Sequence, residues 1–393
     1  MLLPVSHFQR GLAKGKECRH AVSSYPGCVR SAPCRQLFVA RPGNLPSFVK
    51  IFPFLLPGQP LAAYQKSECN VEQSFLAWLK GRQNSLPQIQ LGIGDDAAIV
   101  RCSPGHELVV ANDGIVDGVD FLASTHSLRE VGRKAIAINL SDLAAMRAEP
   151  TAILVQLSLP QQNSTQIAAE VYEGILDICR QYDVAIAGGD LTVYPGPLAI
   201  GVTILGQVPT GKAWQRCGAQ PGDAIVVTGA FGGSLLGRHL QVQPRVREAL
   251  RIASLANIRA AIDVSDGLSL DLDRLCAASG VGAELAVTQI PIHADAYRQA
   301  TEEAQGDGKE TAAKTNPTVA HRTPLQHALG DGEDFELVMA VAPEEVDRLL
   351  ASDCGVSLTR IGTFTKRTGL WLQHTGKLER LAPSGYIHGA ERG

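Results

Sequence analysis

The chain has 393 residues, of which 45% are hydrophobic and 19% are charged, so it can fill sizeable cores and is not disordered throughout. Its formal net charge of −3 gives no basic surface for nucleic acid, and the absence of a run of eighteen apolar residues argues against a membrane span. Nine cysteines without a Cys-x-x-Cys pair predict reduced thiols and a cytoplasmic location rather than a zinc site or a disulfide framework.

Residues 1–66 differ in composition from the rest of the chain. They contain nine Lys and Arg residues against one acid, Glu17, and prolines interrupt them without any sustained periodicity. A transit peptide, a disordered tail and the product of a misplaced start codon all share this composition. We favour the last two explanations and expect this extension to be dispensable.

From Ser67 onward, the pattern predicts alternating helices and strands. Ser127 and Glu130 have the spacing of a capping box, and Pro150 should stop the helix that follows near Glu149. Helices are expected over residues 67–79, 128–149, 164–182, 268–279 and 344–351, and strands over 108–113, 151–159, 184–187, 198–208, 223–228, 260–264, 283–287, 356–365 and 369–373. This alternation predicts an α/β fold with helices on one face of a sheet.

The composition also predicts how this folded part is divided. Glycine, proline and polar residues gather near residues 212–220, so we expect an N-terminal domain over 67–212 and a C-terminal domain over 213–393. Residues 306–323 are polar and poor in apolar side chains, which indicates a mobile surface insertion near 302–320.

Six short clusters combine small residues with carboxylates. They are GIGDDAA at 92–98, NDG at 112–114, NLSD at 139–142, GGD at 188–190, DVSDG at 263–267 and DGED at 331–334. Each cluster alone is typical of a turn. Because each of them follows or ends an apolar run, six unrelated turns are a poor explanation, and carboxylate oxygens are ligands that suit Mg²⁺.

Individual aspartates in these clusters allow two interpretations. Asp142 falls within an apolar helix, so it is either on the surface or directed at a metal. Asp190 follows two glycines at the end of a predicted strand, where α/β sheets bind ligands. Asp266 is a candidate N-cap of the helix that begins at Leu268, and it could also bind metal.

Two glycine-rich stretches are weaker candidates for phosphate binding. The stretch GQVPTGKA at 206–213 is not a P-loop, because Ala213 lacks the hydroxyl that holds Mg²⁺ and Pro209 lacks an amide donor. The stretch GAFGG at 229–233 is either a turn whose amides approach a phosphate or a packing feature, and we favour packing.

The ordered motifs GIGDDAA, NLSDLAAM, AIAGGDLT, AIDVSDGL and GEDFEL resemble those of thiamine-monophosphate kinases, in the aminoimidazole-ribonucleotide-synthetase superfamily, from about Ser67 to Tyr386. The resemblance implies a ferredoxin-like N-terminal domain that binds ATP and Mg²⁺ and pairs with its twin into a dimeric barrel, and a C-terminal α/β domain. It also implies ATP-dependent phosphorylation of thiamine monophosphate to thiamine diphosphate. Such transfer depends on positioning and on charge neutralisation by Mg²⁺, so no side chain is assigned as a catalytic acid or base.

The resemblance also assigns roles to individual residues. Metal binding is implied for Asp96, Ala111 (through its backbone), Asn112, Asp113, Asp142, Asp190, Asp263 and Asp266. ATP contact is implied for Tyr172, Gly189, Arg216 and Ser265, and contact with thiamine monophosphate for Asp120, Glu333 and Tyr386. The implied partners are the two substrates and a second copy of the chain.

Four positions depart from the pattern of the family. Asp120 stands where a His is usual, Asn112 and Leu191 each replace a Thr, and Asp331 replaces a Gly. The metal-binding set is intact and the substrate side is altered. Two alternatives therefore stay open: a related ATP-using enzyme with another acceptor, and a non-catalytic paralogue that binds metal or nucleotide.

Overall fold

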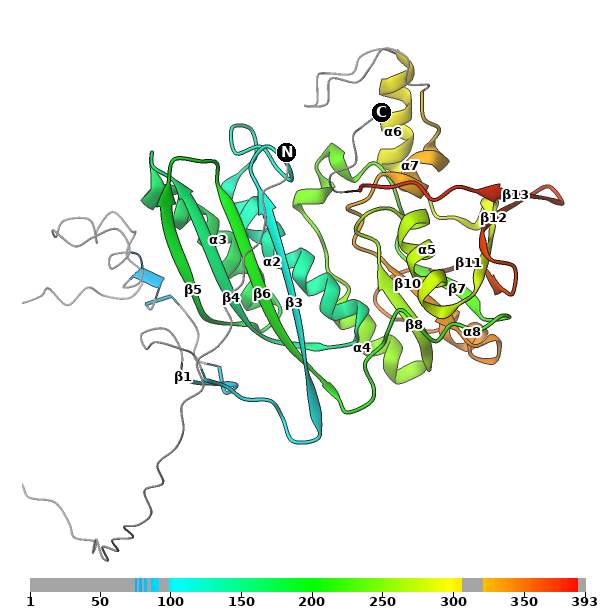
Figure 1. Ribbon diagram of the computed structural model, residues 1–393, viewed down its shortest axis with the longest axis horizontal. Helices are drawn as coiled ribbons and strands as arrows, with labels where there is room; N and C mark the ends of the chain where they lie inside the picture. Colours follow the sequence, from blue (N-terminus) through cyan, green and yellow to red (C-terminus); the bar gives the residue numbers. More distant parts are fainter. Residues whose placement is uncertain are drawn as a thin grey trace, which may run out of the picture. The chain divides into compact units, whose positions relative to one another are not determined.

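The structure is a computed structural model that describes residues 75, 78, 79, 81, 82, 86–91, 99–305 and 321–387 (Figure 1). The predictions for residues 1–66, for Asp96 and for most of the insertion near 302–320 lie outside these residues. Within the described residues, no helix combines the length and the apolar character that crossing a membrane requires.

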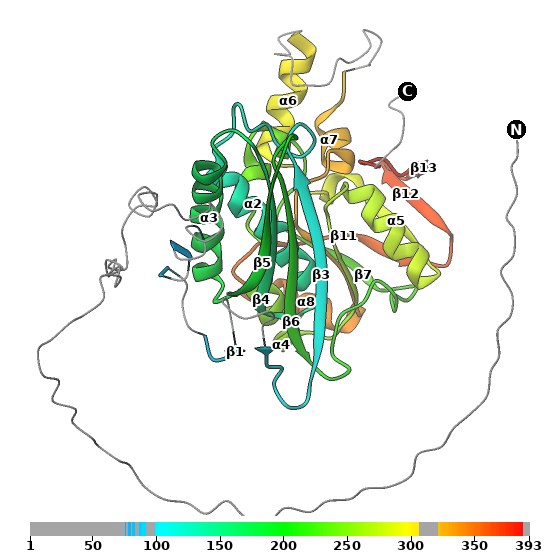
Figure 2. The same ribbon diagram turned by 60° about the vertical axis from the view of Figure 1, so that its left-hand side comes forward.

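The first half of the described chain forms a four-stranded sheet with two helices against it. The strands are β3 (His106–Val116), β4 (Glu149–Pro160), β5 (Ala185–Tyr194) and β6 (Ala199–Pro209), and the helices are α2 (Leu128–Ala145) and α3 (Ser164–Gln181). The sheet order is β3-β6-β4-β5, with β4 and β5 parallel and the other pairs antiparallel. Figures 1 and 2 show both helices on one side of the strands. Every second residue of β6 is accordingly buried, as the predicted sheet with helices on one face requires.

The second half forms a seven-stranded sheet of order β13-β12-β9-β11-β7-β10-β8. Its strands are β7 (Ala224–Thr228), β8 (Ile258–Asp263), β9 (Gly282–Ala286), β10 (Leu337–Val341), β11 (Leu358–Thr365), β12 (Gly369–His374) and β13 (Lys377–Leu381). The other elements are β1 (Ile89–Leu91), β2 (Ile99–Val100), α4 (Val246–Leu255), α5 (Leu268–Ser279), α6 (Ala294–Gln305), α7 (Pro324–Gly330), α8 (Pro343–Leu350) and the 3₁₀ turns η2 (Ser234–Leu236), η3 (Arg238–Leu240) and η4 (Val287–Gln289). The fold is therefore mixed α/β.

The central strands of the larger sheet are buried on both faces. All residues of β7 and β10 are buried, although the two strands are antiparallel. Val226 and Met339 belong to the core that also contains the apolar residues of α2 and α3, whereas Val227 and Val338 belong to the core under α5. Helix α2 thus shares one continuous core with both sheets, and polar side chains on α2 can reach elements of both.

Most predicted elements are confirmed, and three details are wrong. Ser127 is the N-cap of α2 but makes no side-chain cap hydrogen bond. The helix ends at Ala145 and not near Glu149, because Arg147 takes a left-handed conformation (φ 59°) and the Ala148 amide turns back to the Leu143 carbonyl. Strand β5 extends through Tyr194, so Asp190 lies within the strand and not at its end.

Helices α2 and α3 cross at two glycines. A Cβ atom on Gly132 would lie 2.0 Å from the Val171 carbonyl oxygen, and one on Gly174 would lie 1.8 Å from the Arg129 carbonyl oxygen. Both contacts are with backbone, which cannot swing aside as a side chain does. The close crossing holds α2 at a fixed depth between the sheets.

We expect Gly132→Ala to lower the free energy of unfolding by about 1–3 kcal/mol, because the methyl group forces the helices apart. Helix propensity alone predicts the opposite sign, a gain of about 1 kcal/mol. Urea unfolding measures the difference, with Glu170→Ala on the exposed surface of α3 as the control. A stabilised Gly132→Ala variant would contradict the close crossing.

Candidate active site

Helix α2 carries polar side chains where it is buried between the two sheets. Asn139 and Ser141 are fully buried, and Lys134 is 1% exposed. The Asp113 amide of β3 donates to Asn139 Oδ1 at 3.1 Å, and Ser141 Oγ donates to Asp263 Oδ2, at the end of β8, at 2.7 Å. Because buried polar groups need partners, these contacts hold β3 and β8 against α2.

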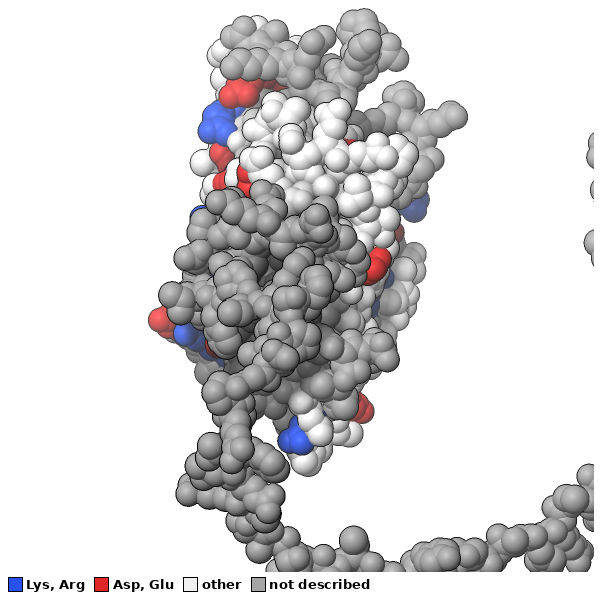
Figure 3. Space-filling view, turned by 90° about the vertical axis from the view of Figure 1, so that its left-hand side faces the viewer, with Lys and Arg blue, Asp and Glu red and all other residues white. Residues whose placement is uncertain are grey.

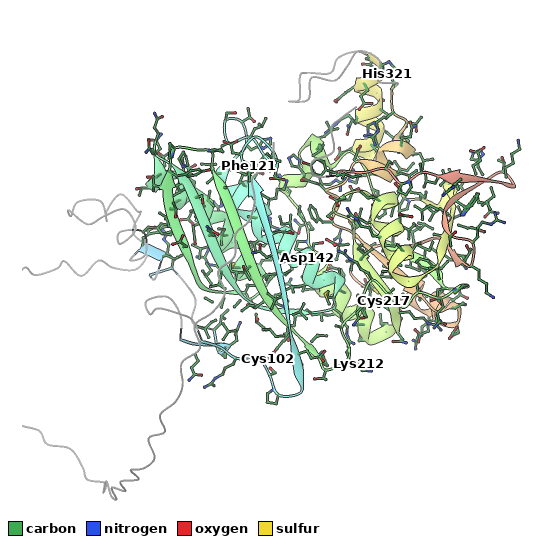
Figure 4. The ribbon with its side chains drawn as sticks, viewed as in Figure 1. Cys102, Phe121, Asp142, Lys212, Cys217 and His321 are labelled. Carbon is green, nitrogen blue, oxygen red and sulfur yellow. The ribbon has the colours of Figure 1, made fainter. Side chains whose placement is uncertain are left out.

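Three carboxylates from three elements gather beside these contacts: Asp113 of β3, Asp142 of α2 and Asp263 of β8. Burial, and then the negative charges of Asp263 and Asp113, raise the pKa of Asp142 to about 8. Burial also raises the pKa of Asp263, against the hydrogen bond from Ser141 and the charge of Arg216. Asp142, labelled in Figure 4 on α2, is therefore not a solvated helix residue.

This cluster is not a preformed metal cage. Among the residues that the structure describes, no three or more His, Cys, Asp or Glu side chains converge as a metal site. Mg²⁺ usually binds through one or two carboxylates together with water and substrate phosphates. The repulsion among Asp113, Asp142 and Asp263 would fall if a cation joined them, and their oxygen-only donor set fits Mg²⁺ better than a softer metal.

Asp266 lies on the turn between β8 and α5, and its side chain does not cap the helix. Gly267 is the N-cap residue, and no side chain caps it. The Asp266 and Gly267 amides instead donate to Asp271 Oδ2 at 2.9 and 3.2 Å, while Arg274 Nη1 lies 2.5 Å from Asp266 Oδ2. The N-cap interpretation of Asp266 is wrong, because Gly267 occupies the N-cap position and the Asp266 carboxylate pairs with Arg274.

The two predicted nucleotide contacts Arg216 and Ser265 adjoin the carboxylates. Arg216 is exposed, and its charge lowers the pKa of both Asp142 and Asp263, so it lies near the cluster. The Ser265 carbonyl accepts the Glu333 amide at 2.6 Å. The predicted nucleotide and acceptor sides therefore meet at Ser265.

The predicted acceptor-side residues are linked through Lys134 and Asp266. Lys134 Nζ donates to the Asp120 carbonyl at 2.9 Å and lies 2.7 Å from Glu333 Oε2. Burial raises the pKa of Glu333, against the charge of Lys134. The Tyr386 amide donates to the Asp266 carbonyl at 2.9 Å. Figure 4 labels Phe121, the neighbour of Asp120, toward the upper end of the four strands, with Asp142 farther down along α2.

Other predicted residues lie on the far face of the four-stranded sheet. Asp113 faces α2, so its neighbour Asn112 faces away, and Asn112 Nδ2 donates to the Val202 carbonyl and to Thr203 Oγ1 at 2.9 and 2.8 Å. Asp190 is on β5, with β4 and β6 between it and β3. Within one chain, Asn112, Asp190 and the adjacent Gly189 are therefore not brought to the carboxylate cluster.

Two further predicted residues are partly or wholly in the core. On β3, Ala111 faces the same side of the sheet as Asp113, and its side chain packs against the shared core. Only its backbone is therefore available as a ligand. Tyr172 on α3 is 4% exposed and meets the Phe75 ring edge-on at 4.8 Å. Burial raises the pKa of Tyr172, and the structure does not bring its ring to the carboxylates.

The unusual Asp331 points away from the predicted acceptor side. Its Oδ2 accepts the Gly233 amide at 2.8 Å, and its Oδ1 lies 2.7 Å from Arg322 Nη1 and 3.0 Å from His327 Nδ1. The Gly232 amide likewise donates to Asp334 at 3.0 Å. The packing interpretation of residues 229–233 is confirmed, since two of its amides hold carboxylates of the chain itself.

The sequence reasoning missed Lys134 and Asp271. A signal for Lys134 was available, because it lies three residues after Val131 and four before Ile138, on the side of the helix predicted to be apolar. Asp271 carried no such signal, since an acid in the first turn of a helix is common.

Two family models match the chain, and together they cover more than half of it. The N-terminal domain of AIR synthase related proteins matches residues 94–208, and the C-terminal domain matches residues 220–374. A helix-backed four-stranded sheet, a larger mixed sheet and carboxylates from both halves thus define an AIR synthase related protein. Escherichia coli HypE, a hydrogenase maturation protein, shares the fold at 18% identity (TM-score 0.60; 80% of this chain and 96% of HypE).

More similar relatives narrow this class. The thiamine-monophosphate kinase of Rhodopirellula baltica is 51% identical over 81% of this chain and 98% of the relative, and that of Escherichia coli K12 is 33% identical over 78% and 94%. The crystal structure of the thiamine-monophosphate kinase from Stenotrophomonas maltophilia has a TM-score of 0.62 at 32% identity, covering 78% and 96%. AaThiL complexed with AMPPCP and TMP has a TM-score of 0.60 at 26% identity, covering 75% and 91%. The chain belongs to the thiamine-monophosphate kinase family.

We expect Asp331→Asn to destabilise the fold by about 1–3 kcal/mol at pH 7, because it weakens charged hydrogen bonds to Arg322 and His327. Burial raises the pKa of Asp331, but the hydrogen bonds from His327 and Gly233 and the charge of Arg322 outweigh it, so the pKa is lowered. A lowered pKa means that the wild type gains stability above the unfolded value and loses it as the pH falls through the folded value.

Urea unfolding of both proteins from pH 7 downward tests this, with the exposed Asp347→Asn on α8 as the control. The difference should persist at pH 5 and shrink below about pH 4. A difference that is absent at pH 7, or one that persists unchanged well below pH 4, would contradict this role of Asp331.

Proposed function

We propose that this chain catalyses the ATP-dependent phosphorylation of thiamine monophosphate to thiamine diphosphate, in the cytoplasm. The observation that carries the proposal is the 51% identity to a thiamine-monophosphate kinase across 98% of that relative. The complex of AaThiL with AMPPCP and TMP supports the choice of substrates.

The departures at Asp120 and Asp331 do not favour another acceptor. Asp120 Oδ2 accepts the Val116 amide at 2.8 Å, which is a turn contact. The carboxylate of Asp331 is engaged by Arg322, His327 and a backbone amide. Both side chains therefore bind groups of the chain itself, and neither contact demands a different substrate.

The reaction joins two phosphates, so two polyanions have to approach each other. Asp113, Asp142 and Asp263 would hold Mg²⁺, with Asp266 beside them, and the roles of Asp96, Asp190, Asn112 and the Ala111 backbone remain proposals from the resemblance. When bound, Mg²⁺ supplies neutralisation of charge on the phosphate oxygens.

The chain itself contributes orientation and one positive charge. Arg216 lies near the carboxylates, and its guanidinium can hold phosphate oxygens of ATP through two parallel hydrogen bonds. Glu333 and Tyr386 are bonded through their amides to the Ser265 and Asp266 carbonyls and would contact the acceptor. No general base is required, because an acceptor phosphate is already ionised at neutral pH.

We further propose a homodimer in which two four-stranded sheets pair into a barrel. The face of the sheet opposite α2 and α3 exposes apolar side chains, among them Val110 at 55% and Leu154 at 38%. Figure 3 looks onto the β5 side and shows an uncharged area in its described part, with charged side chains at the border. An open apolar sheet face with edge strands β3 and β5 is a surface that proteins usually cover.

The kinase proposal is tested by measuring ADP release with thiamine monophosphate and Mg²⁺ for the wild type and Asp142→Asn. We expect kcat/KM to fall by about a hundredfold or more and to recover partly at high Mg²⁺, because one ligand charge is lost. The metal-free melting temperature should stay the same or rise, because the raised pKa means that ionised Asp142 costs stability.

The exposed Asp347→Asn serves as the control and should match the wild type in both measurements. An Asp142→Asn variant with full activity and unchanged Mg²⁺ dependence would remove Asp142 from the site. A wild type that is folded and releases no ADP would refute the kinase assignment.

The dimer proposal is tested by sedimentation of Leu154→Lys at micromolar concentration. We expect the wild type to sediment as a dimer and the variant as a monomer, because burying an unpaired charge is costly. Leu350→Lys on α8 is a matched control, since Leu350 has a similar exposure of 36%. A monomeric wild type that is active would overturn the proposal.

A further inference from the structure

Lys134 is a buried cation with a complete set of partners. Its side chain is 1% exposed, yet its ammonium group contacts the Asp120 carbonyl at 2.9 Å and both Glu333 oxygens at 2.9 and 2.7 Å. An ammonium group has three donors, so this set uses its whole capacity. Burying a lysine is costly unless such partners are present. The arrangement ties two separate stretches of the chain, at Asp120 and Glu333, to one atom of α2.

Unlike the Lys134 side chain, the Glu333 side chain is partly accessible, because one side of it is open. Its side chain is 25% exposed and borders a cavity of about 260 Å³ that Arg238, Gln241 and His293 also line. A carboxylate has about four acceptor positions, and Lys134 occupies only part of them. A molecule in the cavity can therefore contact Glu333, whereas Lys134 lies behind Glu333 and is out of reach.

The backbone around Glu333 is held independently of Lys134. Glu333 takes a left-handed conformation (φ 55°), its amide donates to the Ser265 carbonyl at 2.6 Å, and the preceding Gly332 carbonyl accepts Ser234 Oγ at 2.6 Å. With the main chain held by these contacts, the direction of the Glu333 carboxylate is left to its side-chain partner. Within the described residues, the Glu333 carboxylate is bound through both of its oxygens by Lys134.

Lys134 lies on the same side of α2 as Ser141, which contacts the carboxylate cluster. Ser141 follows it by seven residues, close to two helical turns, and donates to Asp263. One rigid helix therefore sets both the direction of Glu333 and the position of Asp263. The two ends of the site are held at a constant separation of about 10 Å along the helix axis.

From this geometry we propose that Lys134 is a positioning residue that orients Glu333 toward the acceptor, an inference that rests on the proposed kinase function. The acceptor carries a positively charged thiazolium ring, for which an oriented carboxylate is a complementary partner. Loss of Lys134 should weaken the binding of thiamine monophosphate and leave ATP binding, at Arg216 and the carboxylates, nearly unchanged.

The test is steady-state kinetics of Lys134→Met, an apolar change of similar length, with each substrate varied in turn. We expect the KM for thiamine monophosphate to rise about tenfold or more, and the KM for ATP to change by less than about twofold, because only the acceptor side loses its orientation. Arg133→Met, one residue earlier and facing Gln181, is the matched control and should leave both KM values unchanged.

A second variant covers the case in which Lys134→Met does not fold. Lys134→Gln keeps two hydrogen-bond donors without the charge, and we expect the same selective rise in KM to a smaller degree. In the double variant Lys134→Met/Glu333→Gln, the KM for thiamine monophosphate should be no higher than in the worse single variant, because both changes remove one interaction.

The outcomes separate this inference from the kinase assignment. A wild type that does not turn over thiamine monophosphate refutes the proposed function and the acceptor role of Lys134 with it. An active wild type whose folded Lys134 variants keep the wild-type KM for thiamine monophosphate overturns the role of Lys134 alone. Equal changes in both KM values, or additive effects in the double variant, would also overturn the positioning role and show that the Lys134–Glu333 ion pair is structural only.

Discussion

The burial of α2 between two sheets is the constraint on which the site depends. A helix that shares one core with both sheets has to be apolar, except where a polar side chain meets a specific partner. Lys134, Asn139 and Ser141 each meet such a partner, on three different elements. The close glycine crossing with α3 fixes the depth of α2, and the hydrogen bonds then fix what surrounds it. The geometry of the site follows from satisfying these buried groups.

The protein contains two kinds of buried carboxylate. Asp331 and Glu336 are each paired with an arginine, and they hold loops together. Asp142 and Asp263 are grouped with another acid, and burial and mutual repulsion raise the pKa of Asp142 to about 8. Like charges that are grouped in a partly buried position destabilise the folded state, and such unfavourable groupings are typical of functional sites. The distinction rests on the arginine partner and not on the pKa alone, because burial also raises the pKa of the arginine-paired Asp334 to about 7.

The fold alone says little about the acceptor, because Escherichia coli HypE shares it at 18% identity. The residues proposed to select the acceptor lie on a loop with little regular structure, around Gly332 and Glu333. That loop is held from several directions: amides of the 229–233 turn bind its carboxylates, Ser234 binds its backbone, and Lys134 binds Glu333. Because so many hydrogen bonds hold this loop, it can keep one side chain in a constant direction, as a helix or strand would.

The sequence by itself determined the elements whose spacing is local and the order of the carboxylate motifs. The helix over residues 268–279 has the bounds that the pattern predicts, and the mixed α/β class follows from the alternation of elements. Only the tertiary structure decided that Asp142 joins Asp113 and Asp263, that Asp190 is on the far face of its sheet, and that the Asp266 carboxylate pairs with Arg274 and does not cap α5. Periodicity records which side of an element is apolar, but it does not record which distant segment covers that side. A buried charge such as Lys134 is tolerated only because residue 333, almost two hundred positions away, folds back to meet it.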